Sequence, residues 1–211
     1  MLILVYQHFF CDLEEKLKAL DKYLNLIKFI SQYVDFNEDD LKSIYTKVKL
    51  IQLKKNQIFI NEGDIADKIA FTNNGYLRIY YNFDGEEITR DITPLHSFAT
   101  ALPSFITQKP SFEVISAITD CELITIHRDD LEFLYLNYPK WERLGRRIIE
   151  DMFVESQRRI YSFITETAET RYKKLLKQYP EMIHDVPLKY IADFLGIKLQ
   201  SLSRLRKTID W

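Results

Sequence analysis

The chain contains the stretch LKYIADFLGIKLQSLSRLRK at residues 188–207, which decides how its C-terminal third is interpreted. Its apolar residues recur at the spacing of one face on each of two short helices: Ile191, Ala192, Leu195, Leu202 and Leu205. Gly196 separates the two helices, and glycine readily adopts the positive φ that a tight turn requires. Two short helices joined in this way predict a helix-turn-helix.

The second of these helices has an outward face suited to DNA. Arg204 can donate to O6 and N7 of guanine, and Gln200 can pair with adenine. Lysine and serine side chains beside them suit phosphate oxygens, which position a protein on DNA without reading its sequence. The candidate DNA-binding residues are Lys189, Lys198, Gln200, Ser201, Ser203, Arg204 and Lys207. The alternative interpretation is a structural helical hairpin with a solvated face.

Positive charge is concentrated in the same part of the chain. Residues 139–211 hold 15 Lys and Arg against 10 Asp and Glu, whereas the whole chain holds 29 against 31. A basic end on a nearly neutral protein favours a nucleic-acid partner, although chance unevenness would give the same count.

Upstream, residues 48–126 read as short strands separated by turn signals. The expected strands cover residues 49–53, 57–60, 69–71, 76–81, 87–92, 112–118 and 122–126. Asp84-Gly85 is a strong signal for a two-residue hairpin turn. Many short strands with regular turns predict an antiparallel roll or barrel, and with the flanking helices the fold class is α+β.

Helices are expected on both sides of these strands. Apolar residues at 13–27 follow a helical stripe, and a second helix is expected to open at Asn37. One long helix is predicted over residues 140–165, with apolar positions at Trp141, Leu144, Ile148, Ile149, Met152, Phe153, Ile160 and Phe163. This stripe is too broad for one surface, which favours packing against the roll and against a second copy of the chain. A helix buried wholly within one subunit is the alternative.

From about residue 26 to its end, the chain resembles the Crp/Fnr family of bacterial transcription regulators, to which the cyclic-AMP receptor belongs. The resemblance rests on the order of roll, long helix and helix-turn-helix, and on the segments VPLKYIA (186–192) and LSRLRK (202–207). It implies an N-terminal helical extension (1–25), a cyclic-nucleotide-binding-like β-roll with double-stranded-helix topology (26–138), a dimerisation helix (139–165) and a winged helix-turn-helix domain (166–211). The wing strands are expected within residues 180–186, or are missing.

Family members that bind cyclic AMP hold its ribose and phosphate with a Gly-Glu pair and, further along, an Arg-Ser pair. Here these positions are Thr100-Ala101 and Ser111-Phe112, so neither charged residue is present. Burying a phosphate without a cation is costly, which predicts a subgroup whose effector is not cyclic AMP. The candidate effector-pocket residues are Phe98, Thr100, Ala101, Pro103, Ser104, Phe105, Pro110, Ser111 and Phe112. They either line a pocket for a weakly charged molecule or fill it, which would leave the roll as a scaffold.

These features predict a dimeric, cytoplasmic, sequence-specific DNA-binding regulator and not an enzyme. Its expected partners are double-stranded DNA with a palindromic operator, a second copy of the chain and a small-molecule effector of unknown identity, with RNA polymerase left open. No cofactor or metal is expected, because Cys11 and Cys121 are too few for an iron–sulfur cluster and the four histidines are scattered. No membrane segment is expected, since the apolar start at residues 1–6 is far too short to span a bilayer.

The alternative function is a β-roll sensor or adaptor that acts on a protein partner and carries a non-functional helical tail. It would give no reason for Gln200 and Arg204 to face outward beside two lysines.

Overall fold

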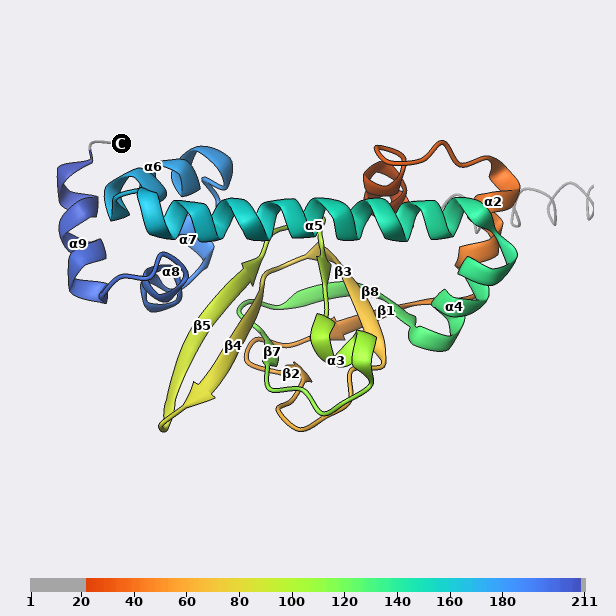
Figure 1. Cartoon of the computed structure of the whole chain (residues 1–211), viewed down its shortest axis with the longest axis horizontal. Coiled ribbons are helices and arrows are strands. Elements are labelled where there is room, and N and C mark those ends of the chain that lie inside the picture. The colour runs from red at the N-terminus through yellow and green to blue at the C-terminus, as the bar shows by residue number, and fades with distance from the viewer. Residues whose placement is uncertain (1–21, 210–211) are drawn as a thin grey trace, which may run out of the picture.

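The computed structural model describes residues 22–209. A β-roll lies beneath one long helix, α5 (Pro139–Thr165), and a group of short helices follows at the C-terminal end of α5 (Figure 1). The opposite end of α5 is flanked by helical residues 22–30, α2 (Glu38–Tyr45) and α4 (Arg128–Asn137) (Figure 1). The predicted α+β class is confirmed. The part of the N-terminal extension before residue 22 lies outside the described residues.

The roll is built from two four-stranded antiparallel sheets. One sheet has the strand order β1-β8-β3-β6 and the other has the order β2-β7-β4-β5. The strands are β1 (Val48–Leu53), β2 (Ile58–Ile60), β3 (Lys68–Asn74), β4 (Leu77–Phe83), β5 (Glu86–Thr93), β6 (Phe98–Ala99), β7 (Val114–Ala117) and β8 (Cys121–His127). Leu77, Ile115 and Leu123 are fully buried between the sheets and form the centre of the roll core.

The local signals in the sequence set several of these elements. Asp84 and Gly85 both have positive φ, 51° and 79°, as a two-residue hairpin turn between β4 and β5 requires. Asn37 caps α2 as predicted: its Oδ1 accepts from the Asp40 amide at 2.9 Å, and the Asn37 amide donates to Asp40 Oδ2 at 2.8 Å. Two short elements were not predicted, β6 and the helix α3 (Leu102–Thr107).

The long helix α5 agrees with its predicted bounds and divides into two halves. In the first half Trp141 and Leu144 are buried against the roll and its flanking helices, and Trp141 Nε1 donates to Ser43 Oγ at 2.9 Å. From Ile149 onward several large apolar side chains are exposed: Ile149, Met152, Phe153, Val154, Ile160, Tyr161, Phe163 and Ile164. The broad stripe expected from the sequence therefore packs on the roll along only part of its width.

The residues after α5 form a separate small core of helices. These are α6 (Ala168–Gln178), α7 (Met182–Asp185), α8 (Leu188–Phe194) and α9 (Leu199–Thr208). Tyr172, Ile191 and Leu202 are fully buried at its centre. Residues 180–186, where wing strands were expected if present, contain α7 instead, and residues 166–209 include no strand.

Candidate nucleic-acid interface and β-roll cavity

Helices α8 and α9 form the helix-turn-helix that the sequence predicted. Ile191, Leu195 and Leu202 are buried at the junction of the two helices, whereas Leu205 is only half-buried. Gly196 makes the turn with φ of +66°, and a Cβ there would lie 2.7 Å from Cε1 of Phe163 on α5. Glycine is therefore favoured at this turn by its backbone conformation, and the ring of Phe163 packs directly against it.

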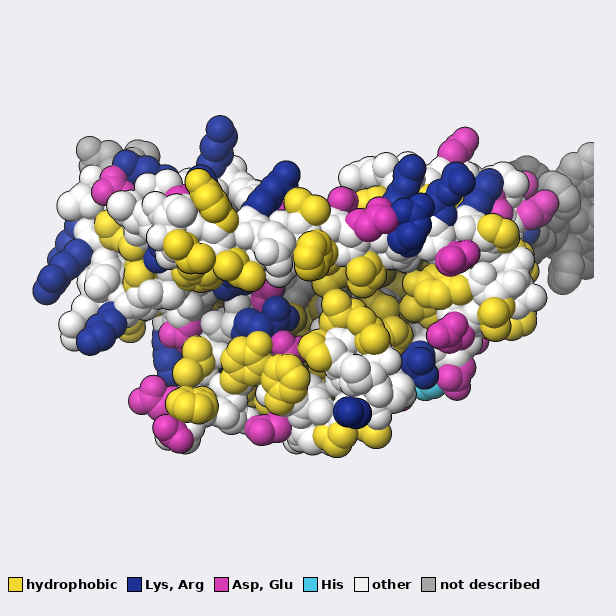
Figure 2. All heavy atoms as spheres, viewed as in Figure 1, with side chains coloured by type: hydrophobic (Ala, Val, Ile, Leu, Met, Phe, Trp, Pro, Cys, Tyr) yellow, Lys and Arg dark blue, Asp and Glu magenta, His cyan; other side chains and the backbone are white. Residues whose placement is uncertain are grey.

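All seven candidate DNA-binding side chains lie on the surface of this module: Lys189, Lys198, Gln200, Ser201, Ser203, Arg204 and Lys207. Figure 2 shows Lys and Arg side chains projecting into solvent at the end of the molecule that carries α9. Within residues 22–209, Lys198, Arg204 and Lys207 make no ion pair. Ser203 is committed locally, because its hydroxyl donates to the Leu199 carbonyl at 3.0 Å. The charged groups of Lys198, Arg204 and Lys207 are thus available to meet an anionic surface.

The helix-turn-helix is attached to the roll through a polar contact that the sequence did not predict. The buried guanidinium of Arg78 on β4 lies between two rings, 4.2 Å from the Tyr80 centroid and 4.0 Å from that of Tyr190 on α8. Its Nε donates to Thr89 Oγ1 at 2.9 Å, and Nη1 pairs with the Glu87 carboxylate. These contacts hold α8 against the β4–β5 hairpin.

Two further contacts strengthen the same junction. Thr89 Oγ1 donates to Asp193 Oδ2 of α8 at 3.1 Å. Arg159 on α5 donates through Nη2 to the carbonyls of Arg90 at 2.6 Å and Phe194 at 3.1 Å. Roll, long helix and helix-turn-helix therefore meet at one point, which fixes the direction in which α9 faces.

The loop around α3 holds the residues expected to contact an effector, and its hydroxyls are already engaged. Ser104 Oγ accepts from the Ala66 amide at 2.9 Å and donates to the Lys109 carbonyl at 2.6 Å. Ser111 Oγ accepts from the Glu113 amide at 3.0 Å and donates to the Glu113 carbonyl at 2.9 Å. Both serines therefore fix the loop itself.

A buried carboxylate lies directly beside the candidate effector loop. Glu113 is 3% exposed, and one of its oxygens, Oε2, has no hydrogen-bond partner within the described residues. Desolvation by burial raises the pKa of this carboxyl, although Oε1 lies 2.9 Å from Arg90 Nε. The Arg90 cation beside the loop is therefore already engaged by this carboxylate and is not free for a phosphate.

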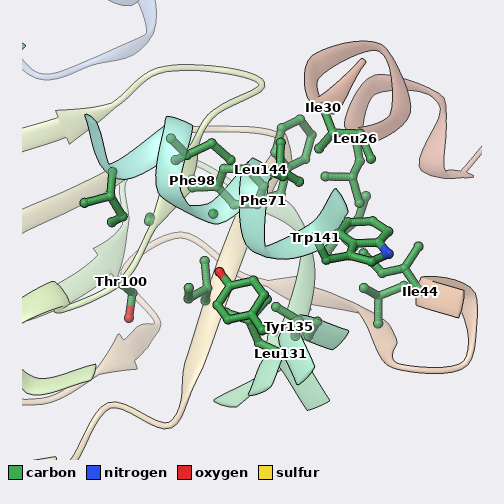
Figure 3. Close-up of a pocket in the computed structure, with 18 of the residues that line it drawn as sticks. Leu26, Ile30, Ile44, Phe71, Phe98, Thr100, Leu131, Tyr135, Trp141 and Leu144 are labelled. Carbon is green, nitrogen blue, oxygen red and sulfur yellow. The ribbon is translucent and has the colours of Figure 1, made fainter. Parts of the chain in front are cut away.

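An apolar cavity of about 100 Å³ lies elsewhere, between the roll and the first half of α5. Figure 3 shows its labelled lining residues converging from helical residues 22–30, α2, the roll, α4 and α5. Phe98 and Thr100 are the two candidate effector residues that line it. Ala101, Ser104, Phe105 and Ser111 are buried outside the cavity wall, while Pro103, Pro110 and Phe112 are exposed. The assignment of the effector pocket to the α3 loop stays a prediction.

The described residues limit two other kinds of site. Residues 22–209 contain no group of three or more His, Cys, Asp or Glu side chains placed to hold a metal ion. None of the helices within that range is long and apolar enough to cross a membrane.

Comparison with known proteins defines the class of the roll. Residues 50–138 match the family of the cyclic nucleotide-binding domain. None of the curated proteins matches this sequence.

Solved structures extend the likeness beyond the roll. FixK2 from Bradyrhizobium japonicum superposes with a TM-score of 0.66 at 15% identity, over 76% of this chain and 83% of that one. The global regulator CLP of Xanthomonas campestris has a TM-score of 0.63 at 15% identity, over 82% of this chain and 91% of that one. A regulator of the Crp/Fnr family from Eubacterium rectale gives 0.61 at 18% identity, over 82% and 83%. The chain has the fold of a Crp/Fnr-type regulator, and the resemblance identified from its sequence is confirmed.

Proposed function

We propose that this protein is a dimeric, sequence-specific DNA-binding transcription regulator of the Crp/Fnr type. The observation that carries the proposal is the outward face of α9, where Gln200, Arg204 and Lys207 are exposed opposite the buried Leu202. A second helix that buries one face in a helix-turn-helix core and presents Arg and Gln on the other is suited to the major groove. Arg204 and Gln200 would read bases, while lysines and serines would contact phosphates.

The exposed apolar face of α5 supports the dimer. Phe153 and Tyr161 are each 64% exposed and Ile164 is 78% exposed, all in the second half of the helix. Large apolar side chains in a row on a helix are stabilised by a partner of the same kind, and an isologous pairing of two α5 helices satisfies both copies at once. Two α9 helices related by that axis would meet half-sites about 34 Å apart, which requires a palindromic operator.

The roll would act as the sensor domain, and its effector is not cyclic AMP. The positions that would hold the phosphate carry no cation, and the buried Glu113 carboxylate lies beside them. A regulator of this kind works on operator DNA in the cytoplasm and performs no chemistry on it.

The test is selection of bound sequences from a random duplex pool at near-physiological salt, with the intact protein and with Arg204→Ala. We expect an enriched palindrome, and a loss of affinity for it in the variant of roughly 5- to 150-fold. Lys49→Ala is the matched control, because Lys49 is an exposed cation on the far module and should leave affinity unchanged. Weak binding that is equal for all three proteins and selects no sequence would contradict the proposal and favour a sensor that acts on a protein partner.

A further inference from the structure

We propose that the cavity beneath α5 is a binding site for a small, uncharged, largely apolar molecule such as a single aromatic ring, with the Tyr135 hydroxyl as its hydrogen-bond partner. This site adjoins the start of α3 through Leu102, but it lies under α5 and not in the α3 loop, where cyclic-nucleotide-binding relatives hold their phosphate. Ligand binding at this site does not depend on the proposed function, but its effect on DNA does.

The chemistry of the cavity wall excludes a charged ligand. The wall has twenty residues and none is charged; they are Leu26, Ile30, Ile44, Val48, Ile69, Phe71, Phe98, Ala99, Thr100, Leu102, Ile124, Ile126, Leu131, Tyr135, Trp141, Leu144, Gly145, Ile148, Ile149 and Met152. Moving an unpaired charge into such surroundings is strongly unfavourable, whereas apolar surface is stabilised there.

The size of the cavity limits the ligand to one ring. Its volume is about 100 Å³, less than the roughly 150 Å³ of an apolar protein cavity that holds benzene while staying free of water, so a single ring fits when side chains of the wall shift outward. Ile149 and Met152 lie on the same wall and are only partly covered, at 43% and 42% exposure. These two side chains border the opening of the cavity in one protomer, and they belong to the same exposed face of α5 that the proposed dimer uses.

Tyr135 gives the cavity one specific polar group. Its hydroxyl makes no hydrogen bond within residues 22–209, and Figure 3 shows it directed into the space between α5 and the roll. The hydroxyl of Thr100, in contrast, already donates to the Lys68 carbonyl at 2.8 Å. Burial raises the pKa of Tyr135 to about 12, so its hydroxyl remains a neutral donor at physiological pH. Tyr135 is half-buried, so its hydroxyl is open to a hydrogen bond with a ligand oxygen placed in the cavity.

Gly145 on α5 explains how the tyrosine reaches this position. A Cβ at Gly145 would lie 2.2 Å from the Tyr135 hydroxyl oxygen and 2.7 Å from Cζ. Glycine is unfavourable within a helix, so its presence in the middle of α5 is consistent with a need for room. The ring of Tyr135 therefore lies directly against the backbone of α5.

A ligand in this place would contact the element that connects sensor and DNA-binding module. Leu144, Ile148 and Met152 belong both to the cavity wall and to α5. The same helix carries the exposed apolar face and leads into the helix-turn-helix (Figure 1). Occupation of the cavity would favour one position of α5 over others and so alter operator affinity.

The binding test uses the full chain with Trp211→Phe, so that fluorescence reports Trp141 alone, and phenol as the probe. Trp141 is 2% exposed and lines the cavity, so a bound ring should change its emission. We expect saturable binding of phenol and of toluene, and none of benzoate or cyclic AMP. Absence of a saturable signal with either neutral probe, or equal binding of the anions, would overturn the site.

Two variants assign the signal to the site. Tyr135→Phe should weaken phenol about fivefold and leave toluene unchanged, because one hydrogen bond is removed and the ring kept. Tyr179→Phe in the C-terminal group of helices, outside the cavity wall, is the matched control and should change neither. Leu144→Phe should abolish binding of both probes by filling the space, with cooperative thermal unfolding as the check that the variant is folded.

Unchanged probe affinity in folded Leu144→Phe would place the ligand elsewhere and overturn the proposal. The coupling is tested by measuring affinity for the selected operator with and without saturating phenol. An altered affinity that disappears in Leu144→Phe supports the regulatory role. An unaltered affinity overturns that role alone, and failure of the operator selection itself would instead reject the proposed function.

Discussion

At the scale of single residues, Arg78 illustrates how a charged group can join two modules. Its guanidinium is 2% exposed, lies between Tyr80 and Tyr190, and bonds Thr89 and Glu87. Each contact is of modest strength, but together they compensate for the desolvation of one buried charge.

We expect Arg78→Ala to lower the free energy of unfolding by about 2–4 kcal/mol, measured by urea denaturation. The variant removes both ring contacts and leaves the hydrogen bonds of Thr89 and Arg159 as the remaining contacts at this junction. Arg146→Ala is the matched control, since Arg146 is exposed and has only an i,i+4 pair with Glu150. Its loss should cost no more than about 0.5 kcal/mol, and a similar loss in both variants would show that the buried link contributes little.

The residues of the helix-turn-helix could be predicted, whereas those of the cavity could not. Ile191, Leu195 and Leu202 follow a local period, and burial of that period leaves Gln200 and Arg204 outside. Tyr135 is one tyrosine among thirteen, and nothing next to it in the sequence indicates that its hydroxyl meets a glycine of another helix. Such a site arises only from tertiary packing.

At the scale of elements, Gly145 allows α5 to pack closely against Tyr135 of α4. An alanine at this position would improve helix propensity by about 1 kcal/mol in an unconstrained helix. Here its Cβ would overlap the ring of Tyr135, which would have to shift away from α5.

We therefore expect Gly145→Ala to lower the free energy of unfolding by roughly 1–3 kcal/mol. In a Tyr135→Ala background the same substitution should stabilise the protein by about 1 kcal/mol, because the obstacle is gone. Urea unfolding of the unsubstituted protein, the two single variants and the double variant gives the double-mutant cycle. Equal effects of the substitution in both backgrounds would show that the ring does not constrain this glycine.

The predictability of each element follows its length and periodicity. The bounds of α5 could be predicted to within a residue, because its apolar pattern repeats over about seven helical turns. The helix ends just before Thr167, which caps α6. The strand β6 has two residues and α3 has six, with a proline in its first turn, so neither contains a measurable period. Their positions depend on pairing with β3 and on the hydrogen bonds of Ser104.

At the scale of the whole molecule, the exposed apolar face of α5 is the surface on which the proposed dimer rests. We expect Phe153→Asp to convert a dimer into a monomer in sedimentation equilibrium and to weaken operator binding to the level of a single module. The reason is that a charge replaces an apolar group in the middle of the proposed interface.

Phe83→Asp provides the matched control for that experiment. Phe83 has the same side chain and nearly the same exposure, 63% against 64%, but lies at the end of the β4–β5 hairpin. It should leave the oligomeric state unchanged. A protein that sediments as one chain at micromolar concentration before any substitution would contradict the dimer.

The length of α5 has a mechanical consequence. Its 27 residues form one uninterrupted helix, which at 1.5 Å per residue is a rod of about 40 Å. If the rod pivots by about 5° at its cavity end, its far end swings by about 3.5 Å, close to the roughly 3.4 Å rise between stacked base pairs. The hydrogen bond from Thr89 to Asp193, 3.1 Å long, lies near that far end and opposes this movement. A small rotation of α5 at the cavity would thus be enough to displace α9 in each protomer of the proposed dimer relative to its half-site by about one base pair.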